Sequence, residues 1–297
     1  MGICYWDARI LWEARLRGVS FDNTLTVGHQ SLYLHPKELQ FFEREFHSHF
    51  PDVAAETLEN YKFGDFSDAF LTSFLGVNNC SILDISSYQG AGIVHDLNLP
   101  VSETLHGQFD SIIDSGSLEH IFNFPVAISN LMRMLKVGGS IFITTPANNL
   151  CGHGFYQFSP ELMFRVFSGE NGFELSRAVM FEGKYPSVEL TSSKRAYNVI
   201  DPEKVKSRVG LLSSYPATLA IEARKIAKVP LFATPPLQSD YVTLWEEADV
   251  AKKQTSIKAK LRDIFEQLPF SIQTMVDGYR QKKKFSFSNR EFYKRLK

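Results

Sequence analysis

FDSIIDSGSLEHIFNFPVAISNLMRMLKVGGSIFITTPANNLCGHGFYQ, residues 109–157, is the stretch that decides the fold of this chain. An apolar run at residues 111–113 leads into small and polar residues, and a segment with apolar side chains at helical spacing follows. Gly138-Gly139 and a β-rich run at residues 141–145 complete the pattern. This order predicts a βαβ unit. Both strands then end at the same edge of a parallel sheet, where open α/β sheets bind ligands.

Composition limits the class of protein. The 297 residues are 44% hydrophobic and 22% charged, which predicts a soluble globular chain with a substantial core. The net charge of −1 gives no electrostatic reason to expect nucleic acid as a partner. The three cysteines are scattered without a CxxC pair, which argues against a disulfide framework or a zinc site and favours the reducing cytoplasm. No apolar run approaches the roughly 20 residues of a membrane span.

Further strands are predicted on both sides of the βαβ unit. Residues 25–27, 81–84 and 93–96 are short β-rich runs, and the chain restarts as a strand at residues 172–179. Two more strand candidates, 208–212 and 217–223, flank a Ser-Ser-Tyr-Pro turn and predict a hairpin. We therefore expect an α/β protein with a Rossmann-like, seven-stranded, mostly parallel sheet that ends in an antiparallel hairpin.

Helical extensions are predicted at both ends of the chain. Apolar residues at helical spacing from Ile3 to Leu11 predict an N-terminal helix packed on the domain, and residues 184–207 are interpreted as an inserted loop. Prolines from Pro230 onward divide the chain into a domain at residues 1–230 and a basic, mostly helical C-terminal extension at 231–297. The basic tail, with an amphipathic segment at residues 257–268, is either a solvated helix face or a surface for an anionic partner or a membrane.

Acidic residues end two of the predicted strands and suggest a nucleotide site. A carboxylate at Asp84 could accept hydrogen bonds from both hydroxyls of a ribose, or it could cap a loop. Asp96 could accept from an adenine amino group, although its surroundings are also good turn chemistry. Ile85 and Leu97, the residues that follow these acids, are included in the predicted site.

Two glycine-containing segments could let the backbone approach a ligand closely. One is Gly28-His29-Gln30, which follows the first predicted strand. The other is Gly64, which precedes the next helix and could share this role. Cofactor loops of such folds usually carry two or three glycines, and here only one follows the strand.

Proton-transferring residues follow the strands of the βαβ unit. Histidine titrates near neutral pH and suits general-base chemistry, so Glu119 and His120 are candidate catalytic residues, unless His120 only caps the helix. His153 joins them from the loop after the second strand, and that loop could instead be rigid packing. No metal site is expected, because the histidines lack ligand spacing.

These stretches together resemble the class I S-adenosylmethionine-dependent methyltransferases, of the methyltransferase type 11-like kind, over residues 22–224. Residues 109–146 look like the fourth strand, helix, glycine turn and fifth strand of that family, and residues 156–175 look like its substrate-side helix and sixth strand. The resemblance implies S-adenosylmethionine as the cofactor, with Asp84 at the ribose and Asp96 at the adenine. It places residues 28–30 at the methionine end and Ser115 and Gly116 beside the sulfonium.

The Leu-Glu-His at residues 118–120 is similar to a motif of ubiquinone-biosynthesis-type O-methyltransferases, in which it serves a metal-assisted or base-assisted transfer. The resulting hypothesis is methyl transfer to an oxygen, or a nitrogen, of a small polar acceptor, with a sugar in polysaccharide biosynthesis as one candidate. His120 or His153 would take the acceptor proton. The predicted substrate residues are Asn148, Tyr156 and Gln157.

Two alternatives come from other classes. The single-glycine loop at residues 28–30 also fits a catalytically inactive methyltransferase-like scaffold or partner-binding subunit. A dehydrogenase-like nucleotide binder is disfavoured, because the first loop lacks GxGxxG.

Overall fold

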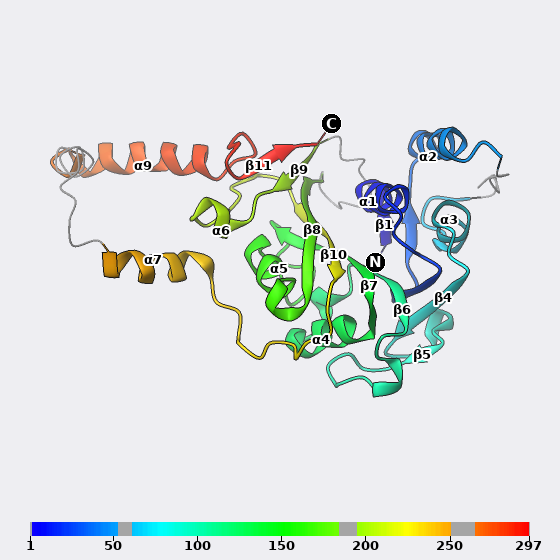
Figure 1. The fold of residues 1–297 in the computed structure, drawn as a ribbon. Coiled ribbons are helices and arrows are strands. Elements are labelled where there is room, and N and C mark those ends of the chain that lie inside the picture. The colour runs from blue at the N-terminus through cyan, green and yellow to red at the C-terminus, as the bar shows by residue number, and fades with distance from the viewer. Residues whose placement is uncertain (1, 53–60, 184–194, 251–264, 297) are drawn as a thin grey trace.

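The computed structural model describes residues 2–52, 61–183, 195–250 and 265–296. Its centre is a sheet with the strand order β11-β9-β8-β10-β7-β6-β2-β4-β5, and helices cover both faces (Figure 1). The strands of this sheet are β2 (Asn23–Val27), β4 (Asn79–Asp84), β5 (Ile93–Val94), β6 (Phe109–Ser115), β7 (Leu135–Asn148), β8 (Phe173–Glu182), β9 (Ala196–Val199), β10 (Ala217–Lys225) and β11 (Tyr293–Arg295). A separate parallel pair joins β1 (Gly2–Cys4) to β3 (Ser31–Tyr33).

The helices connect and cover these strands. They are α1 (Tyr5–Leu16), α2 (Pro36–His49), α3 (Asp68–Phe70), α4 (Phe124–Met134), α5 (Pro160–Val166), α6 (Pro202–Val205), α7 (Ser239–Val250) and α9 (Phe270–Lys284), and a 3₁₀ turn, η4 (Leu118–His120), follows β6. The helix at α5 begins as its sequence predicts: the Ser159 hydroxyl accepts a hydrogen bond from the Leu162 N–H at 3.3 Å, and Pro160 is the first helical residue.

The strand order sets the position of the site. The chain runs from β2 outward to β4 and β5, and then returns to β6 on the other side of β2. All four pairings among β5, β4, β2, β6 and β7 are parallel. The crevice between the C-terminal ends of β2 and β6 is therefore a topological switch point, the place where open α/β sheets bind ligands. The predicted βαβ unit is confirmed as β6, α4 and β7.

The predicted hairpin is corrected by the structure. Residues 208–212 form no strand, and the Leu212 N–H instead donates to the Phe285 carbonyl at 2.7 Å. The strand β10 is inserted antiparallel between β7 and β8. Eight of its nine residues, ATLAIEARK, are buried, which suits a strand between two neighbours better than an edge strand.

The glycine pair of the βαβ unit does not form the predicted turn between the helix and the following strand. Helix α4 ends at Met134, and β7 begins at Leu135, so Gly138-Gly139 lie within the strand. The register of β6 and β7 shifts between Phe109 and Ser111, and Gly138 has φ +90° at this irregularity. A Cβ on Gly139 would lie 2.6 Å from the Asp110 carbonyl oxygen, so only glycine fits the close strand approach.

Two apolar clusters form the core on the two faces of the sheet. The first packs α4 and α5 on the sheet, and the second packs α1 and α2 there. The N-terminal helix is confirmed as a packed helix: Trp6, Leu11 and Trp12 are at most 5% exposed. Burial of one such large apolar side chain stabilises the fold by roughly 1.5–3 kcal/mol.

The C-terminal part of the chain returns to the sheet. Residues 196–199, predicted as part of a loop, form β9, and β11 pairs with it antiparallel. Between them α7 and α9 extend from the body of the molecule (Figure 1), and no residue of α9 is buried. The domain division at residue 230 stays a prediction. Most of the amphipathic segment 257–268 lies outside the described residues, and none of the described helices is long and apolar enough to cross a bilayer.

Candidate functional site

A cavity of about 300 Å³ opens at the topological switch point. It lies at the C-terminal ends of β2 and β4, beside the segments that follow β5 and β6. Its walls are Val27, Gly28, Leu83, Asp84, Ile85, His95, Asp96, Leu97, Asn98, Ser117, His120 and Ile121. The sheet topology alone would place a ligand here, and the lining combines apolar surface with a few polar groups, as small-molecule sites do.

Hydrogen bonds at the end of β2 hold one wall of the cavity in place. Gly28 has φ +73°, a conformation that favours glycine, and its N–H donates to the Leu83 carbonyl at 2.7 Å. The Val27 carbonyl accepts hydrogen bonds from the Gln30 amide and from the Ser117 hydroxyl. The Ser117 bond ties the loop after β2 to the loop after β6.

The two predicted nucleotide carboxylates line this cavity. Asp84 is half-buried, and its Oδ1 accepts from the Ile85 N–H at 2.6 Å. Asp96 accepts at Oδ1 from the Asn98 N–H and side-chain amide, at 2.9 and 2.8 Å, and these bonds, the backbone one first, lower its pKa. Asp96 is therefore an ionised acceptor at neutral pH, and the turn chemistry noted in its sequence is also present.

Five of the ten predicted cofactor residues line the cavity and five do not. Gly28, Asp84, Ile85, Asp96 and Leu97 belong to its walls. The others are His29, Gln30, Gly64, Ser115 and Gly116, which lie outside its lining.

These five residues have evident structural contacts. The His29 ring stacks on Phe66 with centroids 3.5 Å apart, and its Nε2 lies 2.7 Å from Asp68 Oδ2. Gln30 is fully buried, and the Gly64 N–H donates to the Leu32 carbonyl in β3. Ser115 is 5% exposed, and Gly116, with φ +101°, turns the chain from β6 into η4. These five residues do not line the cavity, and their contacts are with the neighbouring segments of the fold.

An acid–imidazole group stands beside the cavity, formed by Glu119, His120 and His153. The imidazoles of His120 and His153 lie with ring centroids 5.2 Å apart, and His153 Nε2 is 3.5 Å from Glu119 Oε1. Glu119 is 1% exposed, and in the described part of the chain its Oε1 has no hydrogen-bond donor. Of the three, His120 also lines the cavity, so its imidazole faces whatever the cavity holds.

Burial sets the protonation of this group. Desolvation, followed by the nearby Asp114, raises the pKa of Glu119 to about 8. Desolvation also raises the pKa of Asp114 to about 6, against the hydrogen bonds that its carboxylate accepts from the Ser117 and Leu118 N–H groups. Burial, and then the neighbouring His153, lower the pKa of His120. Near neutral pH the group thus holds a protonated carboxyl beside a neutral imidazole, which is a pair of proton donor and proton acceptor.

The loop that carries His153 is packed directly on η4. The N–H groups of Phe155 and Tyr156 both donate to the Glu119 carbonyl, at 2.8 and 3.2 Å. A Cβ on Gly154 would lie 2.8 Å from that carbonyl oxygen, so this position excludes a side chain. The glycine is what lets the loop bring His153 to Glu119.

The three predicted substrate residues are engaged in bonds within the loops. Asn148 donates to the Leu211 carbonyl at 3.0 Å, and the Tyr156 hydroxyl donates to the Phe122 carbonyl at 2.6 Å. Gln157 accepts from the Leu150 N–H at 2.8 Å. These contacts hold the rim in place, and a role in acceptor binding stays a prediction.

The acid–imidazole group could also serve as a set of metal ligands, which the spacing of its residues in the sequence did not indicate. Glu119, His120 and His153 each offer one ligand atom, and these atoms lie within 4.8 Å of one another. A carboxylate must be deprotonated to bind a metal, whereas burial favours the protonated form of Glu119 at neutral pH. The arrangement therefore fits a proton-transfer group directly, and a metal only if it displaces that proton.

Six wall residues were missed by sequence reasoning: Val27, Leu83, His95, Asn98, Ser117 and Ile121. Asn98 accepts from the Asn123 N–H at 2.8 Å, which joins the segment after β5 to the start of α4. The Asp-x-Asn spacing at residues 96–98 was the available signal, because such a pair forms a local turn that redirects the chain. The contact with Asn123 depends on tertiary structure.

No family model matches this chain, and no curated protein matches it. Several solved structures are similar to it. The trans-methyltransferase CalH in complex with SAH is 12% identical, with a TM-score of 0.39, over 73% of this chain and 55% of that chain, so this chain spans about half of CalH. The N-methyltransferase NodS from Bradyrhizobium japonicum is 12% identical, with a TM-score of 0.38, over 74% of this chain and 94% of that chain.

A third similar structure is the 1,6-didemethyltoxoflavin-N1-methyltransferase from Burkholderia thailandensis, at 11% identity and a TM-score of 0.37, over 75% of this chain and 78% of that chain. The [4+2]-cyclase SpnF is also similar, at 15% identity and a TM-score of 0.31 over 58% of each chain. Similarity this remote leaves the chemistry of the chain to be judged from its own residues. Three of these four similar structures are methyltransferases by name.

Proposed function

We propose that this chain is an S-adenosylmethionine-dependent methyltransferase, and that the cavity at the switch point holds the cofactor. One observation supports this most: His120 lines the cavity and also belongs to the acid–imidazole group. A methyl acceptor that enters between cofactor and histidine would meet the methyl group on one side and a proton acceptor on the other. Asp84 and Asp96 would hold the ribose and the adenine, respectively.

The acceptor is an oxygen, or a nitrogen, of a small polar molecule, and sugar hydroxyls of polysaccharide precursors are the first candidates. The cofactor supplies the electrophilic methyl group. The chain orients the acceptor oxygen for in-line attack, which accounts for much of the rate of such transfers. His120 takes the proton from the acceptor, because its lowered pKa keeps the ring neutral and basic near neutral pH.

Glu119 and His153 position this base. The protonated Glu119 carboxyl faces His153 Nε2 at 3.5 Å, and the two rings pack at 47° to one another. As His120 gains a proton, the buried carboxyl can release its own through His153 toward solvent, which limits charge accumulation in the group.

Calorimetric titration with S-adenosylhomocysteine tests the cofactor directly. We expect saturable binding, and Asp84→Asn should weaken it by about tenfold to a hundredfold, because one ribose hydrogen bond to a charged acceptor is lost. Glu170→Gln is the matched control, since Glu170 is an exposed acid outside the cavity. The absence of binding at high micromolar ligand would reject the proposal and favour an inactive scaffold.

Methyl transfer is then assayed with radiolabelled cofactor and a panel of sugars, nucleotide-sugars and amines. A product from hydroxyl acceptors supports the specific proposal, and a product from amines alone would redirect it to nitrogen. The same assay with a chelator separates the two roles of the acid–imidazole group. Activity should survive removal of divalent metal if the group transfers protons, and it should be lost if the group holds a metal.

A further inference from the structure

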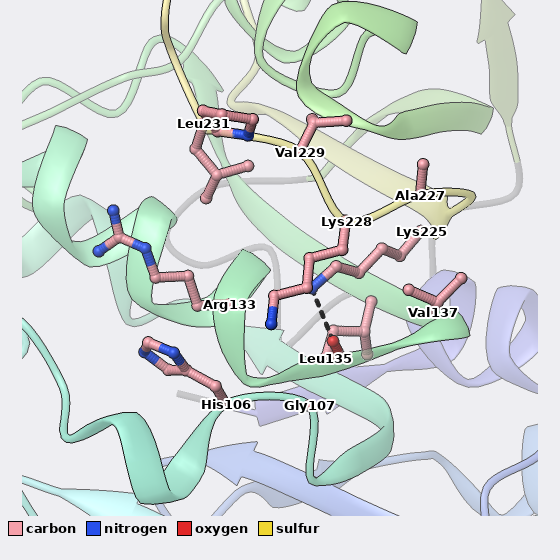
Figure 2. Close-up of a pocket in the computed structure, with 11 residues that line it drawn as sticks. His106, Gly107, Arg133, Leu135, Val137, Lys225, Ala227, Lys228, Val229 and Leu231 are labelled. Atoms are coloured by element: carbon pink, nitrogen blue, oxygen red, sulfur yellow. Dashed lines mark hydrogen bonds between the residues drawn. The ribbon is translucent and has the colours of Figure 1, made fainter.

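A second cavity lies at the opposite edge of the sheet from the proposed cofactor cavity. It has a volume of about 240 Å³ and is bounded by the loop before β6, the end of α4, the start of β7 and the segment after β10 (Figure 2). Four of its lining side chains carry basic groups: His106, Arg133, Lys225 and Lys228. Among the residues that the structure describes, no acidic side chain lines it.

Lys225 has its own partners and acts as an anchor. It is 7% exposed, and its Nζ donates to the carbonyls of Met132 and Leu135, at 2.6 and 2.8 Å; Figure 2 draws the second of these bonds. These carbonyls end α4, where the helix dipole favours a cation. Desolvation, followed by Lys228, lowers the pKa of Lys225 to about 8. The charge of Lys228 thus contributes to this lowering, after burial.

The other three basic groups are without partners in the described part of the chain. Arg133 and Lys228 are exposed, and neither forms an ion pair or a side-chain hydrogen bond with a described residue. The Nε2 of His106 is buried and has no hydrogen-bond partner there. A buried polar nitrogen without a partner costs free energy, and so do cations gathered without a counter-charge. An anion in the cavity would remove both costs.

We propose that this cavity binds a phosphate monoester of a small molecule. Arg133 can contact phosphoryl oxygens in a bidentate manner, Lys228 supplies a point charge, and His106 Nε2 supplies a third hydrogen bond. The remaining walls are apolar, with Leu135, Val137 and Leu231, so the ester carries an apolar body. This binding is separate from methyl transfer, since the two cavities lie at opposite edges of the sheet.

The loop contacts make the cavity a built feature of the fold. The Gly107 N–H donates to the Arg133 carbonyl at 2.9 Å, and the Gln108 N–H donates to the Met134 carbonyl at 2.8 Å. These bonds fix the loop that carries His106 on the end of the helix that carries Arg133. Lys225 fixes the third wall to the same helix end through its two carbonyl bonds.

The test titrates the full chain with phenyl phosphate, inorganic phosphate and phenol in a calorimeter. We expect saturable binding of phenyl phosphate at one site, weaker binding of inorganic phosphate, and none of phenol. The double variant Arg133→Gln/Lys228→Gln should weaken both phosphate ligands by at least about tenfold, because two charge-assisted contacts are lost. Arg224→Gln is the matched control: Arg224 is an exposed cation next to Lys225 in sequence, but it does not line the cavity.

The outcomes separate the proposal from its rivals. No saturable binding, or equal weakening by the double variant and by Arg224→Gln, would mean an adventitious ion only and would overturn it. Binding to vesicles that contain phosphatidic acid, found in addition to phenyl phosphate binding and lost in the double variant, would assign the phosphomonoester to a lipid headgroup. S-adenosylhomocysteine binding should be unchanged in every variant, so failure here leaves the proposed cofactor site standing.

Discussion

At the edge where the parallel strands end, the buried ionisable groups are carboxyls, whereas at the opposite edge the buried ionisable group is an amine. Asp114 and Glu119 are each 1% exposed, and desolvation raises the pKa of both. Lys225 is 7% exposed, and desolvation lowers its pKa. In both cases burial favours the neutral form. The carboxyls of the first edge therefore keep their protons to a higher pH, and the amine of the second loses its proton at a lower pH.

The two edges differ in what completes them. The carboxyl edge has neighbouring imidazoles that can exchange its proton, and this suits catalysis. At the basic edge Lys225 donates to two carbonyls, and the lining also carries Arg133, Lys228 and the imidazole of His106, so this edge suits the binding of an anion. The comparison teaches that burial alone does not make an active site, because a proton acceptor must also stand beside the perturbed group.

The largest effect is expected at His120, where the carboxyl edge would lose its base. His120→Ala should lower the rate of methyl transfer by about 10²- to 10⁴-fold while S-adenosylhomocysteine binding changes little, because a general base contributes this much to the chemical step. Single-turnover rates with saturating cofactor measure it. His47→Ala, on the exposed part of α2, is the control. A rate within twofold of wild type would remove His120 from the mechanism.

Gly154 tests whether the edge depends on the position of its loop. Gly154→Ala should reduce the rate by roughly 10- to 100-fold, since the new methyl group meets the Glu119 carbonyl and displaces His153 by a fraction of an ångström to an ångström. Gly152→Ala is a close control, because a Cβ there meets no atom within 4 Å. Equal rates for the two variants would show that the His153 position is not critical.

Glu119 is expected to make the stability of the fold fall as pH rises. Its folded pKa of about 8 lies above the ordinary value of 4.5, so its contribution is complete below 4.5 and is lost as pH rises through 8. Glu119→Gln should reduce the slope of the free energy of unfolding against pH by roughly 1.4 kcal/mol per pH unit between pH 6 and 8. Urea titrations at a series of pH values measure this slope. The window begins at 6 because Asp114, with a pKa of about 6, titrates below it. An unchanged slope would show that burial does not hold the proton.

Lys225 should show the opposite sign, which completes the comparison. Its folded pKa of about 8 lies below the ordinary 10.5, so its charged form costs stability below pH 8, and this cost disappears as pH rises toward 10.5. Lys225→Met should remove that rise in the free energy of unfolding, and it should cost about 1–3 kcal/mol by leaving two carbonyls without a donor. Lys204→Met, at an exposed lysine of α6, should do neither. A pH profile like that of the wild type would contradict the assignment.

The sequence indicated the central unit and the chemistry of the first edge, because both depend on local pattern. Alternation of apolar runs with helical spacing predicted β6, α4 and β7, and the strand-end rule pointed to Asp84 and Asp96. It misjudged Gly138-Gly139 and residues 208–212, since a glycine in a strand bulge and a glycine after a helix look alike in sequence. The strand β9 was missed because the polar residues before it resemble a loop.

By itself the sequence determined which side chains could do chemistry, since identity and spacing along one strand or helix are local properties. Only the tertiary structure decided which of them meet. Glu119 and His153 are far apart in sequence, and they come together because Gly154 allows close contact with the Glu119 carbonyl. The basic cavity needs three segments whose contacts span more than 90 residues, from Lys225 to Met132. Such contacts depend on loop closure and packing across the sheet, which no local pattern encodes.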